Sequence, residues 1–342
     1  MGFAAACMST FGWGSDLVEK AAERAQKLAE NLGDGEALFG ATWIRWTYYY
    51  LAGDQRKALE LAKTIRQMAE AGPPGVATLA AAHAVGFTHY SRGELLQAIE
   101  VLEWGRTIFD IELDRHMLPA FQLASGNALH TISASVYWIL GETEKSDQMR
   151  TRALEISVEL EHMPNRVHCL HVSSWSLMFN RDWSRLRKHI IMTRKIAEDE
   201  NLLLWIPMCD AYLAIADIGE GDIERGQRLL DSGLSGMLEL GTKLTMPQFV
   251  ICAADALLTA GHPDKALARL DEIGQDMQVR EELLLWSEFL RIRGAALLQL
   301  GRKQQGLADL KAAVSEAQRY ERGPLLRRAK ESLAASLENS TV

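Results

Sequence analysis

The chain has 342 residues, of which 48% are hydrophobic, and its 37 Lys and Arg against 45 Asp and Glu give a net charge of −8. This balance argues against a nucleic-acid-binding surface, which needs clustered Lys and Arg to displace counterions. The four cysteines are widely spaced, which argues against a secreted disulfide framework and favours a reducing, cytoplasmic location.

The first 35 residues predict a truncated repeat. Residues 1–11 lack the basic start and the long apolar core of a secretory signal, and Ala6 occupies the position where myristoylation needs Ser or Thr. A short helix is expected at 3–11. A longer one should follow, since the stretch from Ala21 is similar to the stretch from Ala58. We expect the array to start within a unit, in a chain that is a fragment or a lone relative of a longer signalling protein.

Glycines recur on one grid through residues 36–322. Steps of 40, 48, 80, 40 and 40 residues separate Gly53, Gly93, Gly141, Gly221, Gly261 and Gly301. Arg181 occupies the one grid position that lacks a glycine. A 40-residue unit with one insertion of eight therefore repeats, and a fixed period of this length indicates a repeat architecture.

Each unit predicts two helices. The glycine closes the first helix, because the left-handed backbone conformation there costs least without a Cβ atom. The acidic residue that follows at most grid positions suits the start of the second helix. Small residues stand seven before and five after the grid position, as in Ala214 with Gly226 and Gly294 with Gly306, and would let paired helices approach closely. Large apolar residues at helical spacing would fill the space between them.

We therefore predict an all-α fold, a right-handed α-solenoid that occupies residues 1–342 as one domain. Residues 36–322 would hold about seven helix-turn-helix repeats, and residues 323–342 a C-terminal capping helix and tail. A solenoid can exceed the size of a single compact core because each unit touches only its neighbours.

The motifs that could carry chemistry are weak. His162, His168, Cys169 and His171 form the one histidine-rich stretch, and no acidic third ligand for zinc lies at the right spacing on that helix. Residues 236–243 imitate a phosphate-binding loop with the final Lys and Thr reversed and no strand before it. The longest apolar run, 202–209, is too short to cross a membrane. We predict no catalytic site, metal, cofactor or membrane span, and therefore no enzyme.

The pattern of small and large residues resembles the tetratricopeptide repeat, whose usual unit is 34 residues. Residues 31–34 and 51–62 resemble the tetratricopeptide-like C-terminal region of bacterial signalling ATPases, which are adenylate or guanylate cyclases and transcription regulators. Residues 286–294 match best, with an acidic residue, a basic pair and a glycine on one helix, and residues 327–334 also fit. At 126–128 the chain departs from the pattern, which would have Asp-Pro after the glycine, so the local conformation of the third unit stays open.

In tetratricopeptide arrays the first helices line the concave face, and the resemblance implies the same here. The residues expected to face that groove are Trp43, His83, Phe87, His168, His171, Trp175, Gln248, Asp255, Glu288 and Arg291. His168, His171 and Trp175 share one helix face. Next to it, Trp43, His83 and Phe87 are expected to form an aromatic patch. An amphipathic peptide or helix could dock there. The alternative is that these aromatic residues pack between repeats.

These observations predict a non-catalytic interaction and regulatory module that receives a protein or peptide partner. The resemblance implies that it passes the signal to an attached ATPase, cyclase or DNA-binding module. The alternative is a sensor whose superhelix closes around a small-molecule or peptide effector. We expect no nucleic-acid or membrane partner, and a homodimer through the truncated N-terminal unit is plausible.

Overall fold

The computed structural model describes residues 16–121, 123–320 and 323–338, and the short helix expected at 3–11 lies outside them. The described chain is helical throughout, which confirms the predicted all-α class. The helices are α2 (Asp16–Leu32), α3 (Gly35–Leu51), α4 (Gln55–Glu70), α5 (Val76–Ser91), α6 (Leu95–Thr107), α7 (Ile111–Phe121), α8 (Ser125–Leu140), α9 (Thr143–Glu159), α10 (Met163–Phe179), α11 (Trp183–Asp199), α12 (Trp205–Gly219), α13 (Ile223–Glu239), α14 (Met246–Thr259), α15 (Pro263–Asp271), α16 (Gly274–Arg280), α17 (Trp286–Gln299), α18 (Lys303–Ala317), η1 (Gln318–Tyr320) and α19 (Pro324–Glu338).

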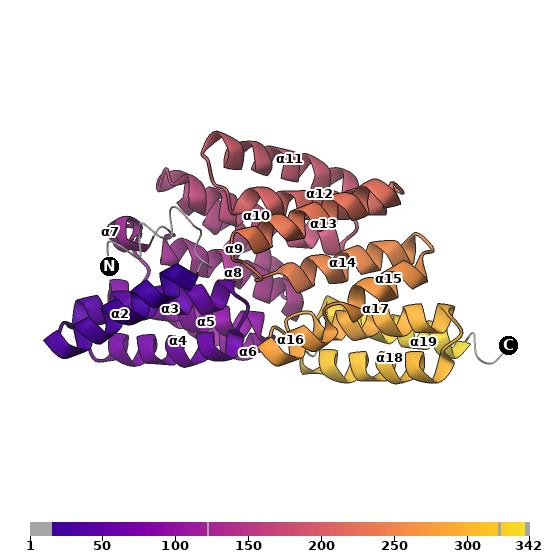
Figure 1. The fold of residues 1–342 in the computed structure, drawn as a ribbon, viewed down its shortest axis with the longest axis horizontal. Coiled ribbons are helices and arrows are strands. Elements are labelled where there is room, and N and C mark those ends of the chain that lie inside the picture. Colours follow the sequence, from indigo (N-terminus) through magenta and orange to yellow (C-terminus); the bar gives the residue numbers. More distant parts are fainter. Residues whose placement is uncertain (1–15, 122, 321–322, 339–342) are drawn as a thin grey trace.

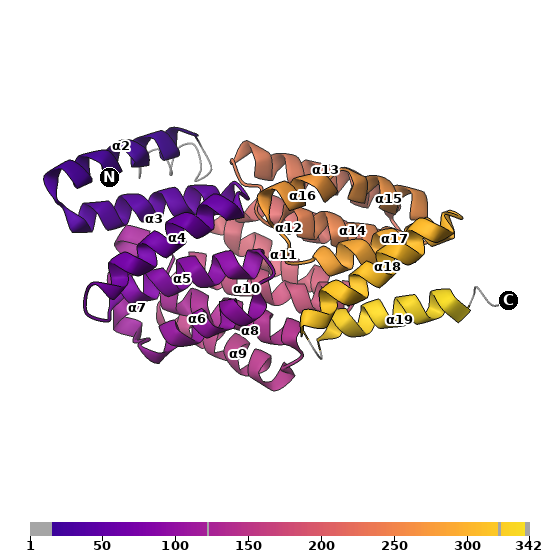
Figure 2. The same cartoon turned by 90° about the horizontal axis from the view of Figure 1, so that it is seen from below.

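The helices form pairs that stack side by side (Figure 1). The first helices of the pairs are α3, α5, α8, α10, α12, α14 and α17, and the second helices are α4, α6, α9, α11, α13, α15 and α18. Helix α19 packs on the last pair, and α16 is a short addition after α15. Figure 2 shows the early helices α3 to α5 on the left and the late helices α17 to α19 on the right, with α16 between them.

The grid residues close the first helices as predicted. All six grid glycines have positive φ angles, from 73° at Gly93 to 101° at Gly221. The acidic residue that follows caps the second helix in three units, where Asp54, Asp182 and Asp222 accept a hydrogen bond from the backbone N–H three residues later. Arg181 adopts the same left-handed conformation, with a φ of 55°, although it carries a Cβ atom.

The small residues allow the helices of a pair to touch, as predicted. A Cβ atom on Gly294 would lie 2.9 Å from the carbonyl oxygen of Gly306, and one on Gly306 would lie 2.7 Å from that of Gly294. A Cβ atom on Gly226 would likewise lie 2.7 Å from the carbonyl oxygen of Ala214. Real Cβ atoms do not approach backbone oxygens this closely, so these contacts require glycine.

Helix α7 fills the eight-residue insertion and gives the third unit its own local structure. The Asp114 carboxylate accepts hydrogen bonds from the backbone N–H groups of Gly126 and Asn127 at 2.7 and 2.8 Å. It thereby caps the N-terminus of α8 from another helix. A Cβ atom on Gly126 would lie 2.3 Å from the ring of Phe109, so the missing Asp-Pro is replaced by a tightly packed contact with the insertion.

The curved array closes on itself through contacts between turns remote in sequence. The carbonyl oxygen of Leu51 accepts from the backbone N–H groups of Lys243 and Leu244 at 2.8 and 3.0 Å. Forty residues further on, the carbonyl oxygen of Ser91 accepts from the N–H of Leu284 at 3.1 Å. We call this contact the clasp; it joins residues 51–53 and 91–92 to residues 242–245 and 280–284. In Figure 1 it lies where α16 meets the ends of α5 and α6.

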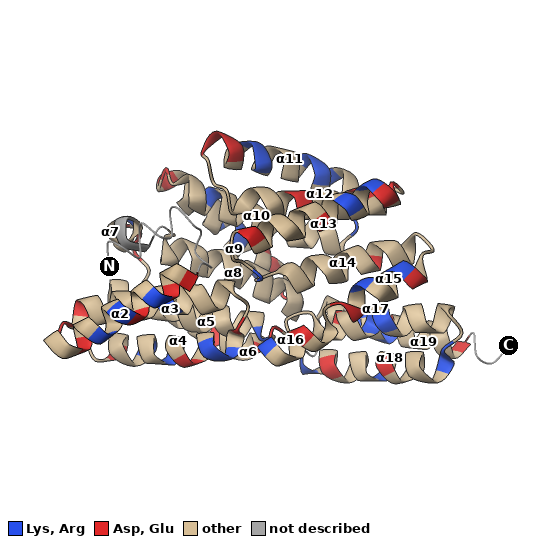
Figure 3. Ribbon diagram, viewed as in Figure 1, with Lys and Arg blue, Asp and Glu red and all other residues tan. Residues whose placement is uncertain are grey.

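Charged residues of both signs alternate along the outer helices, such as α2 and α11 (Figure 3). Among the helices described, none is long and apolar enough to span a membrane.

Candidate ligand groove

One groove, lined by residues of several repeats, has about 730 Å³ of empty space, part of it open to solvent. Helices α8, α9 and α10 supply most of its walls, with Tyr90 from α5. The opposite wall comes from late repeats, through Gln248 of α14 and through Leu284 and Leu285, which precede α17. A molecule in the groove would therefore touch both early and late units.

A row of aromatic rings runs along one side of the groove. Trp138 and Phe179 stack with ring centroids 5.1 Å apart, and Phe179 stacks with Trp175 at 6.1 Å. Trp175 continues the row to Phe249 at 5.8 Å. Trp138 and Phe179 are half-buried, whereas Trp175 is buried, so the outer end of the row is open to an apolar side chain.

Polar groups line the groove as well. The hydroxyls of Tyr90 and Ser135 are 2.6 Å apart, and Ser173 donates to the carbonyl oxygen of Cys169 at 2.7 Å. Gln248 is buried, and its side-chain oxygen has no hydrogen-bond partner among the described residues. An unpaired buried acceptor is unfavourable, so this oxygen would gain from an N–H or O–H donor on a ligand.

The predicted aromatic and histidine residues do come together. His83 lies 5.3 Å from Trp43 and 4.0 Å from Phe87, and Phe87 stacks with His168 at 6.1 Å, measured between ring centroids. Trp205 continues the cluster to His171 at 5.1 Å. The two aromatic groups expected from the sequence are thus one continuous cluster.

This cluster is a packed interior, because each of its predicted members is at most 8% exposed. Burial lowers the pKa of His83 to about 3, of His168 to about 4 and of His171 to about 3, so these rings are neutral near pH 7. Among the residues described, no group of three His, Cys, Asp or Glu side chains could hold a metal ion. Packing between repeats describes these positions better than an open patch.

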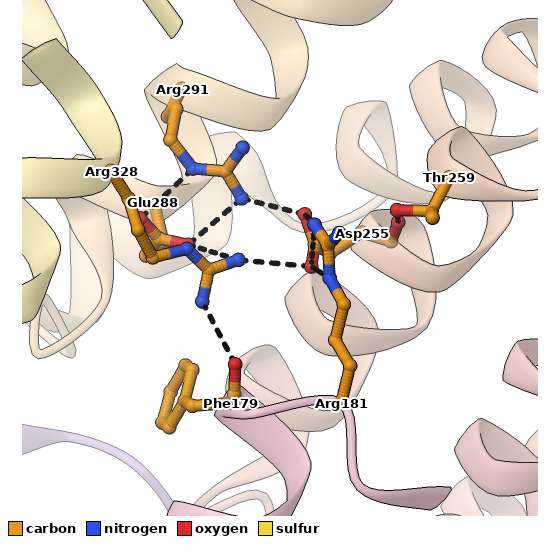
Figure 4. A network of polar contacts seen from close by, with 7 residues as sticks. All are labelled: Phe179, Arg181, Asp255, Thr259, Glu288, Arg291 and Arg328. Atoms are coloured by element: carbon orange, nitrogen blue, oxygen red, sulfur yellow. Dashed lines mark hydrogen bonds and ion pairs between the residues drawn. The ribbon is translucent and has the colours of Figure 1, made fainter. Parts of the chain in front are cut away.

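Three of the predicted site residues carry charged side chains, namely Asp255, Glu288 and Arg291, and they belong to a buried ionic cluster (Figure 4). Arg291 contacts Asp255 at 2.6 Å and Glu288 at 2.9 Å. Arg328 of α19 contacts the same two carboxylates at 2.9 and 3.2 Å, and Arg181 reaches Asp255 at 2.9 Å. Burial would raise the pKa of Asp255, but the three arginines outweigh it and hold that pKa below its usual range.

Of the ten predicted site residues, Trp175 and Gln248 line the main groove, and Asp255 and Glu288 line a smaller pocket of about 240 Å³ beside it. A binding role for all ten stays a prediction. Tyr90, Trp138 and Phe179 also line the groove, although they were not predicted from the sequence. They stand two or three positions before the grid, where the apolar pattern indicates packing between helices.

No protein-family model matches the chain. A protein of Rhizobium meliloti (strain 1021), described only as uncharacterized, is 22% identical over 333 residues, which are 95% of this chain and 32% of that protein. The chain thus spans about a third of the length of the curated relative it matches.

Solved structures of low sequence identity resemble the fold. A Rap protein complexed with Competence and Sporulation Factor has a TM-score of 0.58 at 13% identity, over 98% of this chain and 96% of that one. Aspartyl phosphate phosphatase F from Bacillus subtilis has a TM-score of 0.52 at 10% identity, over 88% and 75%. These likenesses and the stacked helix pairs together establish a tetratricopeptide-like helical repeat fold.

Proposed function

We propose that the protein is a non-catalytic regulatory module that binds a short peptide segment in the groove between α8, α10 and the turn before α17. One observation carries the proposal: an open aromatic row lines the same groove as the Gln248 side-chain oxygen, a buried acceptor with no partner in the part of the chain that the structure describes. A peptide supplies both complements, because its side chains can stack on Trp138 and Phe179 while a backbone N–H donates to Gln248.

The fold is consistent with this ligand class. The Rap protein of similar fold was solved with Competence and Sporulation Factor bound, which supports a comparable role for this array. The matching region is a third of the Rhizobium relative, and residues 286–294 resemble the repeat region of signalling ATPases. We therefore propose that the module reports to an effector module of that kind.

A small-molecule effector is the second candidate. The serine hydroxyls at positions 135, 173 and 176 line the groove, as does Gln248 on the opposite wall, and such polar walls also suit a compact polar ligand. Mass spectrometry of metabolites bound to protein purified from its source cell separates the two candidates. A retained metabolite that competes with peptide would favour the small-molecule sensor.

The test of the peptide proposal is selection from a phage-displayed decapeptide library on the immobilised protein. We expect selected peptides to share an aromatic or large apolar residue, and Trp138→Ala to weaken their binding at least tenfold. Trp104→Ala is the matched control, because Trp104 is also half-buried but lies on α6 outside the groove. No enrichment over an unselected pool, or equal loss in both variants, would refute the proposal.

A further inference from the structure

We propose that occupation of the groove and closure of the clasp are coupled, so that a ligand in the groove holds the early and late repeats together. This inference rests on the proposed function, since it assigns a regulation to the same groove. Its basis is that residues of the groove wall belong to, or directly adjoin, the clasp.

The clasp is a repeated contact and not an isolated one. Leu51 and Ser91 are the last residues of α3 and α5, and carbonyl groups at a helix end lack partners within the helix. Backbone N–H groups from the segments before α14 and α17 satisfy them, with Leu244 and Leu284 in corresponding positions. The hydroxyl of Thr242 adds a bond to the Leu51 oxygen, 191 residues away in sequence.

The first link to the groove is Leu284. Its backbone N–H donates to Ser91 across the clasp, and Leu284 itself lines the groove. On the other side, Tyr90 precedes Ser91 and also lines the groove, where its hydroxyl meets that of Ser135. A ligand that contacts both Tyr90 and Leu284 therefore spans the position of a clasp hydrogen bond.

The second link is Gln248. Its side chain lines the groove and approaches the carboxyl group of Glu282 closely enough to affect its pKa. Glu282 is buried in the clasp, where one of its oxygens accepts from the N–H of Thr245 at 3.0 Å. The other oxygen would lie 3.2 Å from a Cβ atom on Gly53, so the carboxyl group packs directly against the turn between α3 and α4. A ligand that holds the Gln248 amide in place would therefore also hold the Glu282 carboxyl group in its position within the clasp.

The clasp can open without unfolding the repeats. Besides the packing of the buried Leu244 and Leu284 side chains, it consists of a few hydrogen bonds and an ion pair between Arg92 and Glu281, whose side chains are 17% and 35% exposed. The units themselves are held by helix-to-helix packing with their immediate neighbours. A ligand that touches both walls binds the closed form better than the open form, and it shifts the equilibrium by that difference in affinity.

The test uses the fluorescent aromatic anion 1-anilinonaphthalene-8-sulfonate as a groove probe and hydrogen exchange as the clasp readout. In the wild-type protein, saturating probe should slow exchange of the Leu244 and Leu284 amides about tenfold, within the usual range of allosteric coupling. The amide of Gly221, which bonds within its own turn, is the internal reference and should not change.

Linkage requires the reverse effect as well. Arg92→Glu places two negative charges across the clasp and should weaken probe binding about tenfold. Arg228→Glu is the matched control, because it makes the same charge change at a side chain that is 72% exposed on α13. The melting curve of each variant shows whether its helices stay folded. If Arg92→Glu does not fold, the exchange experiment on the wild-type protein still tests the coupling.

The outcomes separate the two proposals. Probe that binds at the groove while the Leu244 and Leu284 amides exchange at their former rate overturns the coupling and leaves the peptide proposal intact. Equal affinity of the probe for Arg92→Glu and wild type overturns it too. If the probe does not bind, and Trp138→Ala does not weaken the binding of the selected peptides, the groove is not a binding site and both proposals are refuted.

Discussion

Arg181 and Asp255 lie 74 residues apart in sequence and are joined by three hydrogen bonds between guanidinium and carboxylate. Arg181 occupies the grid position that glycine fills in the other units, and it keeps their left-handed backbone conformation. The turn before α11 is thereby tied to α14, across the interior of the array. The Cβ atom of Arg181 introduces strain in the left-handed backbone conformation, and the hydrogen bonds of its guanidinium group to Asp255 offset part of that strain.

The first prediction separates the backbone from the side chain at this turn. Arg181→Ala removes the ion pair and keeps the strained conformation, whereas Arg181→Gly removes both. We expect the glycine variant to be about 1 kcal/mol more stable than the alanine variant, because the left-handed region costs a Cβ-bearing residue about that much. The pair itself contributes little, since the Arg181 side chain is 40% exposed. Urea unfolding of both variants measures the difference, and an alanine variant at least as stable as the glycine variant would contradict it.

The second prediction concerns the shared carboxylate of the ionic cluster. Asp255→Asn leaves Arg291, which is buried, with one charged partner fewer, and breaking a buried pair in this way costs about 3–5 kcal/mol. Glu224→Gln is the control, because Glu224 is 84% exposed and its pair with Arg228 should contribute less than about 1 kcal/mol. Urea unfolding at pH 7 gives both values.

The pH dependence of this difference follows from the lowered pKa of Asp255. A carboxyl group with a depressed pKa in the folded state stabilises the fold above its unfolded pKa of about 3.9, and this contribution is lost as pH falls through the folded value. The gap between wild type and Asp255→Asn should therefore stay constant from pH 7 to about 5 and narrow below about 4. A gap that already closes between pH 7 and 5 would show that another group is responsible.

The sequence predicted the repeat fold because each unit is specified by local residues. The grid glycines are required only because a helix ends at their position. Gly294 and Gly306 are required only because their two helices touch at these residues. The clasp could not be predicted in the same way. Leu51 meets Leu244 because small rotations between neighbouring pairs add up along the array, and no local pattern records that sum.

The candidate site was predicted in part for the same reason. Trp175 and Gln248 were found because they stand at inward-facing positions of first helices. His83 and Phe87 stand at equivalent positions, but the curvature of the array packs them into its interior. Trp138 was missed because its place in the repeat indicates packing between helices, whereas it borders the opening that remains.

The third prediction tests the close approach of α17 and α18. Gly306→Ala adds a Cβ atom that would lie 2.7 Å from a backbone oxygen of α17, so the helices must separate. We expect a loss of about 1–3 kcal/mol, although alanine favours helix over glycine by about 1 kcal/mol. Gly35→Ala is the control, since a Cβ atom there meets nothing within 4 Å and should be neutral or slightly stabilising. Thermal unfolding of both variants decides, and equal effects would refute the steric explanation.

The last prediction concerns the carboxyl group buried in the clasp. Burial raises the pKa of Glu282 to about 7, against the lowering effects of the Thr245 N–H, the Gln248 side chain and Arg280, while Asp276 raises it further. Tyr50 also faces it. A carboxyl group with a raised pKa gives its full stabilisation below its unfolded pKa of about 4.3, and this is lost as pH rises through the folded value. The clasp should therefore weaken between about pH 4.5 and 7.

Glu282→Gln keeps the shape of the side chain and removes the titration. The buried histidines at 83, 168 and 171 have lowered pKa values and add a slope of opposite sign, since their stabilisation is lost as pH falls from about 6.5. That slope is common to both proteins, so the difference between them isolates Glu282. We expect the variant to gain stability relative to wild type as pH rises from 4.5 to 7, by about 3 kcal/mol for a shift of this size. Urea unfolding at half-unit pH steps measures this difference, and a constant difference would mean that Glu282 is ionised in the clasp throughout.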